Sequence, residues 1–133
     1  MTTALPDAAG RFLQGVCSLD IDLAASGLSA EARLSAGAGP LAIGKARIRR
    51  LLILATSRLE SIRFDPAVVW FHRNLAIVEA DLCCQRCDHA RLDFPVTLTL
   101  YFRDNLIFDI HVHTYEAAVI SVLGAMRPRR RSA

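Results

Sequence analysis

The stretches Phe94–Phe102, FPVTLTLYF, and Leu106–Tyr115, LIFDIHVHTY, decide the fold of this chain. In the first stretch, apolar side chains occupy every even position from 96 to 102. In the second, Phe108, Ile110 and Val112 continue the same alternation. A strict period of two predicts β-strands that turn one face to a core or cavity and the other to water or a partner.

The segments on either side predict an α+β fold in which helices precede the sheet. Asp104 and Asn105 tolerate the left-handed conformation of tight hairpins, so Arg103-Asp104-Asn105 is predicted to join the two strands. The other predicted elements are, in chain order, a helix within Leu5–Leu28 interrupted at Asp20 and Asp22, a strand over Ser29–Ser35, a loop over Gly37–Gly44, a helix over Lys45–Ile62, strands over Ala67–Leu75 and Leu82–Asp88 with a turn at Glu79–Asp81, a loop over His89–Asp93, and a helix or strand extension over Glu116–Met126.

The length and the charge of the chain limit how many domains it can form and which partners it can bind. The 133 residues indicate one domain, for which we predict residues 1–126, followed by a basic, disordered tail over 127–133. The tail holds four of the sixteen basic side chains, so the rest carries twelve against thirteen acidic ones. This balance does not favour a nucleic-acid partner. The sequence has neither a long uncharged apolar run nor a secretory signal, so we expect a cytoplasmic protein with no membrane partner.

Several short motifs follow one another in a distinctive order. They are the helix end SLDID at 18–22, SAEARL at 29–34, Ile43-Gly44-Lys45 before the second helix, the EAD and RDN turns, and the strand IFDIHVHTYE at 107–116. In this order they resemble the SnoaL-like and ketosteroid isomerase-like superfamily, which shares the fold of nuclear transport factor two. The resemblance implies a cone-shaped, cystatin-like topology, with N-terminal helices packed in the concavity of a strongly curved, mainly antiparallel sheet. It also implies an apolar pocket open at one end, and pairing as a homodimer through the convex sheet face.

The same resemblance argues against one reaction, the isomerisation of steroids. The tyrosine of the steroid isomerases falls at Phe12, and their two aspartates fall at Ala36 and Leu98, none of which transfers protons. The strand aspartate of the epoxide hydrolases on this fold falls at Val112. Whether the protein is an enzyme is therefore left open. If it is one, the resemblance implies an isomerase, cyclase or dehydratase that needs no cofactor.

Strand parity gives a prediction for the pocket. If Arg73 and Arg86 point outward, His72 points inward, where an imidazole can act as acid or base near neutral pH. If the protein is an enzyme, we predict His72 as the catalytic residue; the alternative is a histidine of the core or rim that only makes hydrogen bonds. The full predicted pocket lining is Phe12, Trp70, Cys83, Gln85, Cys87, Leu98, Leu100, Ile110 and Val112.

Two other clusters attract attention but do not predict a metal site. His111 and His113 lie on one strand face about 6.6 Å apart, but the sequence places no third ligand beside them. Cys84 and Cys87 point to opposite faces of a strand, which argues against a redox pair, and the thiols are interpreted as small apolar fillers. The predicted dimer face comprises Thr97, Thr99, Tyr101, His111, His113 and Tyr115.

Two functional hypotheses follow. The first is a small-molecule-binding protein with an apolar pocket for a steroid- or polyketide-like compound. The second is a non-catalytic dimerisation or adaptor module that uses the convex sheet face.

Overall fold

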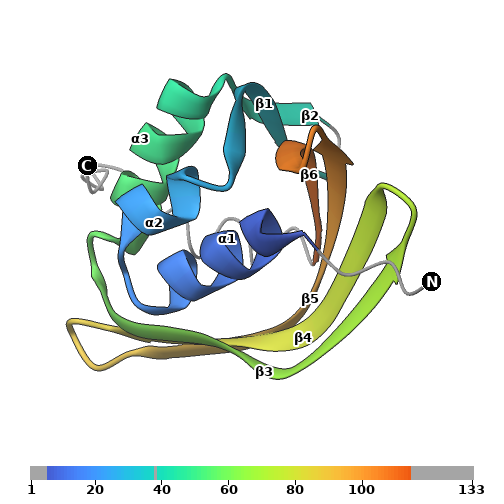
Figure 1. The fold of residues 1–133 in the computed structure, drawn as a ribbon. Helices are drawn as coiled ribbons and strands as arrows, with labels where there is room; N and C mark the ends of the chain where they lie inside the picture. The colour runs from blue at the N-terminus through green and yellow to red at the C-terminus, as the bar shows by residue number, and fades with distance from the viewer. Residues whose placement is uncertain (1–5, 38, 115–133) are drawn as a thin grey trace.

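Six strands form one curved sheet that wraps around the N-terminal helix (Figure 1). The computed structural model describes residues 6–37 and 39–114. The strand order is β2-β1-β6-β5-β4-β3, in which only β1 and β6 pair in parallel. This arrangement confirms the α+β prediction. The predicted segments over Glu116–Met126 and 127–133 lie outside the described residues.

The three helices of the described residues cover the concave side (Figure 1). They are α1 (Asp7–Cys17), α2 (Ile21–Ala25) and α3 (Lys45–Thr56). The interruption predicted at Asp20 is confirmed, because its Oδ1 accepts a hydrogen bond from the Leu23 backbone N–H at 3.1 Å and caps α2. Helices α1 and α2 pack very closely at Gly15, where an added Cβ would collide with the Ala24 backbone.

The six strands differ in length from the predicted ones. They are β1 (Leu28–Ala36), β2 (Gly39–Ile43), β3 (Leu59–His72), β4 (Leu75–Arg86), β5 (Arg91–Arg103) and β6 (Leu106–His113). Their inward side chains form the core together with the helices, and the largest fully buried ones are Leu28, Ile48, Val78, Leu100, Ile107 and Ile110.

The loop predicted over Gly37–Gly44 is wrong for residues 39–43, which form β2 antiparallel to β1. Glycine and proline argued against regular structure there. Pro40 is nevertheless compatible with a strand at the sheet edge, where its missing N–H leaves no ladder hydrogen bond unmade. Gly44 then enters α3 with φ 98°, a conformation that favours glycine.

The helix predicted over Lys45–Ile62 ends at Thr56 instead. The hydroxyl of Thr56 donates to the Leu52 carbonyl at 2.7 Å, and that of Ser57 donates to the Leu54 carbonyl at 2.8 Å. Such local bonds compete with the helix ladder and are common at helix ends. The chain then pairs from Leu59 onward with β4, so tertiary pairing overrides the helical period.

The turn predicted at Glu79–Asp81 is also wrong. These residues lie in the middle of β4, and the chain reverses at Arg73, which has φ 58°, and Asn74. The charges of Glu79 and Asp81 belong to the exposed face of an ordinary alternating strand, whose inward positions include Val78.

The hairpin predicted at Arg103-Asp104-Asn105 is confirmed, with φ of 53° at Asp104 and 64° at Asn105. The prediction that Phe108 shares the inward face with Ile110 and Val112 is wrong. The register between β5 and β6 shifts at this point, so Ile107 pairs with Phe102 and is buried. A bulge places two successive side chains on the same side. Phe108 therefore lies on the convex face, under the Arg103 guanidinium at 4.4 Å.

Candidate functional site

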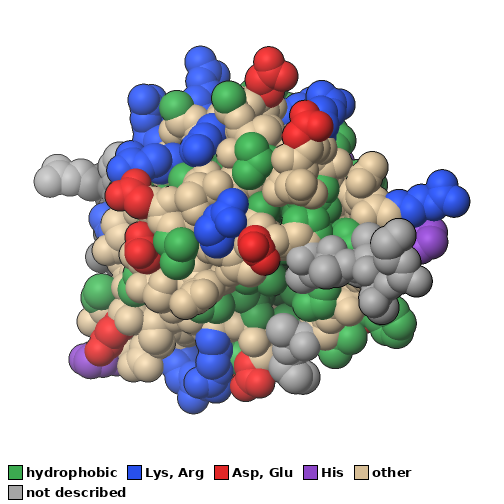
Figure 2. All heavy atoms as spheres, in the orientation of Figure 1, with side chains coloured by type: hydrophobic (Ala, Val, Ile, Leu, Met, Phe, Trp, Pro, Cys, Tyr) green, Lys and Arg blue, Asp and Glu red, His purple; other side chains and the backbone are tan. Residues whose placement is uncertain are grey.

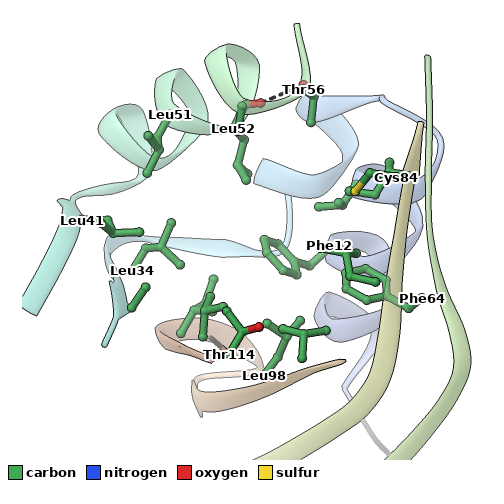
Figure 3. Close-up of a pocket in the computed structure, with 18 of the residues that line it drawn as sticks. Phe12, Leu34, Leu41, Leu51, Leu52, Thr56, Phe64, Cys84, Leu98 and Thr114 are labelled. Carbon is green, nitrogen blue, oxygen red and sulfur yellow. Dashed lines mark hydrogen bonds between the residues drawn. The ribbon is translucent and has the colours of Figure 1, made fainter. Parts of the chain in front are cut away.

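A cavity of about 170 Å³ lies between α3 and the concave face of the sheet (Figure 3). Leu51 and Leu52 reach into it from α3, Phe12 reaches into it from α1, and Leu34 and Leu41 approach it from β1 and β2. The sheet closes the opposite side with residues of β3 to β6, among which are Ile62, Phe64, Leu82, Cys84, Phe94, Val96, Leu98, Ile110 and Val112.

Two hydroxyls belong to residues of the lining, and both already donate hydrogen bonds. Thr56 Oγ1 donates to the Leu52 carbonyl, and Thr114 Oγ1 donates to the Pro95 carbonyl at 2.7 Å. None of the described lining residues carries a charge. A polar group on a ligand would therefore find few partners in this cavity and would lose hydrogen bonds to water.

Cys84 supplies the one thiol among the described lining residues. Burial raises its pKa from 9.0 to about 11, with smaller contributions from the nearby Cys83, Asp93 and Cys17. The thiol therefore stays protonated near neutral pH, whereas nucleophilic chemistry requires the thiolate. Cys84 acts here as a small apolar side chain.

Comparisons with known proteins bear on the fold rather than on the reaction. No protein-family model matches the sequence, and no curated protein sequence matches it. Among solved structures, a proposed polyketide cyclase from Pseudomonas putida superposes with a TM-score of 0.77 at 13% identity, covering 90% of this chain and 98% of that one.

Two further solved structures show the same likeness. A protein of ketosteroid isomerase-like fold from Catenulispora acidiphila, in complex with trimethylamine, has a TM-score of 0.74 at 11% identity, covering 91% of this chain and 95% of that one. TerC, co-crystallised with polyporic acid, has a TM-score of 0.73 at 15% identity, covering 89% and 96%. The chain has the SnoaL-like and ketosteroid isomerase-like fold.

Within this SnoaL-like fold, four of the predicted lining residues face the cavity: Phe12, Leu98, Ile110 and Val112. Leu100, also predicted, is fully buried in the core and does not line the cavity.

The parity predicted for β3 and β4 is wrong. Cys84 faces the cavity, so Cys83 and Gln85 lie on the other face, and Cys87 lies beyond β4 in an exposed position. Arg73 misled the prediction for β3, because it belongs to the turn rather than to the strand. Arg86 misled the prediction for β4, because it is the last residue of that strand, two positions from Cys84, and is paired with Asp88. The buried alternation through Ala76, Val78 and Cys84 is the signal that gives the correct parity.

Trp70 and His72 do not face the cavity either. Through the sheet register Trp70 is aligned with Ile77 and Thr99, and His72 with Leu75 and Tyr101. These rows run across the convex face, where Trp70 is 60% exposed and His72 is exposed. The predicted acid–base residue is therefore on the opposite side of the sheet from the cavity.

The residues predicted for the dimer face do share the convex side. Thr97 is aligned with His113, Thr99 with His111, and Tyr101 with Asp109, while Tyr115 lies outside the described residues. His111 and His113 have stacked rings with centroids 6.1 Å apart. His111 Nε2 lies 3.3 Å from Asp109 Oδ1, at an ion-pair distance but without hydrogen-bond geometry.

Within residues 6–37 and 39–114, no cluster of three or more His, Cys, Asp or Glu side chains has a geometry suited to a metal ion. None of the described helices is long and apolar enough to span a bilayer.

Proposed function

We propose that this protein binds an apolar small molecule in the cavity between α3 and the sheet. The observation that carries the proposal is the lining itself, in which the described residues contribute aliphatic and aromatic side chains, two hydroxyls already engaged and one neutral thiol. Empty apolar space in a core costs stability, because the side chains around it lose packing contacts. A ligand that fills the space restores those contacts.

The volume indicates the size of the ligand. An engineered cavity of about 150 Å³ lined by Leu, Ile and Phe stays dry and binds benzene, whereas pockets for drug-sized compounds hold about 300–1,000 Å³. At about 170 Å³, the cavity accommodates a small aromatic compound of one ring or two fused rings. A steroid- or polyketide-like compound would place one apolar end inside. The likeness to proposed polyketide cyclases supports this class of compound.

The same lining favours binding over turnover. An isomerase, cyclase or dehydratase without a cofactor needs a side chain that takes up or releases a proton at the bound substrate. The described lining offers only Cys84 for that purpose, and its raised pKa of about 11 keeps the thiol protonated. We therefore propose that the ligand leaves the cavity chemically unchanged.

A cavity-filling substitution tests the proposal. Val112 lines the cavity and is half-buried, so Val112→Phe fills part of the space and should weaken binding of naphthalene about tenfold or more, measured by calorimetry. The matched control is Val68→Phe, an exposed position outside the cavity lining, which should bind as the unmodified protein does. If naphthalene fails to bind the unmodified protein, or binds both variants equally, the cavity is not the site.

A second function, the non-catalytic dimerisation module, is favoured by one observation. Trp70, Val68 and Tyr101 are large apolar residues that stand exposed together on the convex face. Exposed aromatic side chains of this kind are typical of interface centres. We propose that two copies pair through this face. Trp70→Glu should then give a monomer by light scattering with unchanged naphthalene binding, whereas an unchanged mass would exclude this face as the interface.

A further inference from the structure

The outer side of α3 combines cations with exposed aliphatic side chains. Arg47, Arg50 and Leu54 are three and four residues apart and therefore lie along one side of the helix, and Ile53 lies one turn from Arg50. Ile53 and Leu54 are both among the exposed large hydrophobic residues. Figure 2 shows Lys and Arg side chains gathered at the upper left, where Figure 1 places α3. We call these four residues the α3 surface.

The charges of the α3 surface are not balanced by neighbours. The helix sequence, KARIRRLLILAT, contains four basic residues and no acidic one. Arg49 is paired with Asp22 of α2 at 2.8 Å. Within the described part of the chain, Arg47 and Arg50 make no ion pair or side-chain hydrogen bond, and both are exposed.

The opposite side of the same helix forms a wall of the cavity through Leu51, Leu52 and Ala55. Leu41 of β2 also lines the cavity while remaining exposed. One helix thus separates an apolar cavity from a surface that carries cations and aliphatic side chains. A partner that covers the α3 surface would lie against the cavity wall.

The cations and the aliphatic side chains of the α3 surface each restrict the class of partner that can bind there. The arginines favour an anionic partner, which includes nucleic acid, an acidic protein and an anionic lipid surface. Exposed Ile53 and Leu54 favour a partner that also offers an apolar phase, which a phosphodiester backbone does not. A helix surface with Arg at its polar positions and Leu and Ile beside them matches the interface of an anionic bilayer.

We propose that the α3 surface docks on an anionic phospholipid bilayer, with Arg47 and Arg50 at the headgroups and Ile53 and Leu54 at the acyl boundary. Peripheral docking of this kind needs no membrane-spanning helix, which is the feature on which the sequence-based expectation of no membrane partner rests. The docked orientation brings the cavity wall to a phase in which apolar compounds dissolve. Docking itself does not depend on whether the cavity is occupied.

Co-sedimentation of the full chain with vesicles tests the proposal. We expect binding to vesicles of phosphatidylglycerol and phosphatidylcholine in equal parts, weakened by salt, and much weaker binding to phosphatidylcholine alone. Each arginine near an anionic surface contributes about fivefold, which corresponds to about 1 kcal/mol. The double variant Arg47→Gln/Arg50→Gln should therefore bind about 30-fold more weakly than the unmodified protein.

Matched control variants distinguish binding through the α3 surface from a general attraction between basic residues and anionic vesicles. Arg63→Gln/Arg91→Gln removes the same formal charge from two exposed arginines of β3 and β5, each of which lies beside a carboxylate, Asp65 or Asp93, and it should leave binding within about twofold. Leu54→Ser should weaken binding. Val69→Ser should not, because Val69 is an exposed residue of β3 outside both the α3 surface and the proposed dimer interface (40% exposed, against 49% for Leu54). Circular dichroism would verify that each variant is folded.

Four results would overturn the proposal. One is no binding to the anionic vesicles, and another is equal loss of binding in the two double-arginine variants. The third is binding that disappears when residues 127–133 are removed but is unaffected by Arg47→Gln/Arg50→Gln, since the tail is also basic. The last is binding to a DNA oligonucleotide in place of vesicles, which would assign the arginines to nucleic acid.

Discussion

Leu98 and Leu100 provide a direct test of the cavity, because they are the same residue on the same face of β5, two positions apart. Leu98 is 5% exposed and lines the cavity, whereas Leu100 is 0% exposed and is surrounded by the core. Replacing either by alanine removes three carbon atoms. Any difference between the two variants therefore reports the surroundings of each side chain rather than its chemistry.

The magnitudes follow from the packing. Losing three buried carbons costs about 2.4 kcal/mol from the transfer term alone, at about 0.8 kcal/mol per carbon. At Leu100 the substitution also opens a new void, and the total should reach about 4 kcal/mol, within the range of about 2.7–5.0 kcal/mol for such changes. At Leu98 part of the side chain already faces empty space, so fewer contacts are lost and about 2.5 kcal/mol is expected.

Urea unfolding followed by circular dichroism measures the free energy of unfolding of each variant. The two values can be compared directly if the dependence of that free energy on urea concentration is the same for both variants. A saturating apolar ligand adds a second reading. It should raise the unfolding midpoint of Leu98→Ala, in which the cavity is enlarged, at least as much as that of the unmodified protein. A cost at Leu98 equal to or greater than that at Leu100 would refute the reasoning, since it would mean that Leu98 is packed on all sides.

Three other predictions follow from local features. Folding raises the pKa of Cys84 from 9.0 to about 11, so as the pH rises the thiol loses its proton first in the unfolded state. The free energy of unfolding should therefore fall between pH 9 and pH 11. Cys84→Ala should lack this decrease when unfolding is measured as a function of pH. Asp20→Ala removes the α2 cap and should cost about 1 kcal/mol in urea unfolding. Gly15→Ala should lower the melting temperature because its Cβ meets Ala24, whereas Gly10→Ala, with open space around it, should raise the melting temperature.

The sequence predicted the features that depend on local periodicity and turn chemistry. The alternation over Val96–Phe102 identified β5 and its inward face, and Asp104 and Asn105 identified the hairpin that follows. The same reasoning brought Leu98, Ile110 and Val112 to the cavity. Such patterns are readable because side chains alternate along a strand whatever it pairs with.

The errors occur where pairing between strands outweighs the preference of a segment taken by itself. Gly39–Ile43 becomes a strand because β1 supplies its hydrogen bonds, and Leu59 leaves the helical pattern because β4 does the same. A bulge at Phe108 reverses the parity of one residue within an otherwise regular strand.

The sequence by itself determined that an alternating sheet follows helices and that the sheet has an apolar face. Only the tertiary structure decided which face of β3 and β4 is the apolar, inward one. It places His72 and Trp70 on the convex surface rather than in the cavity. The physical reason is that a strand has two equivalent faces until its neighbours are placed. A change of one residue in register moves every side chain from one face to the other.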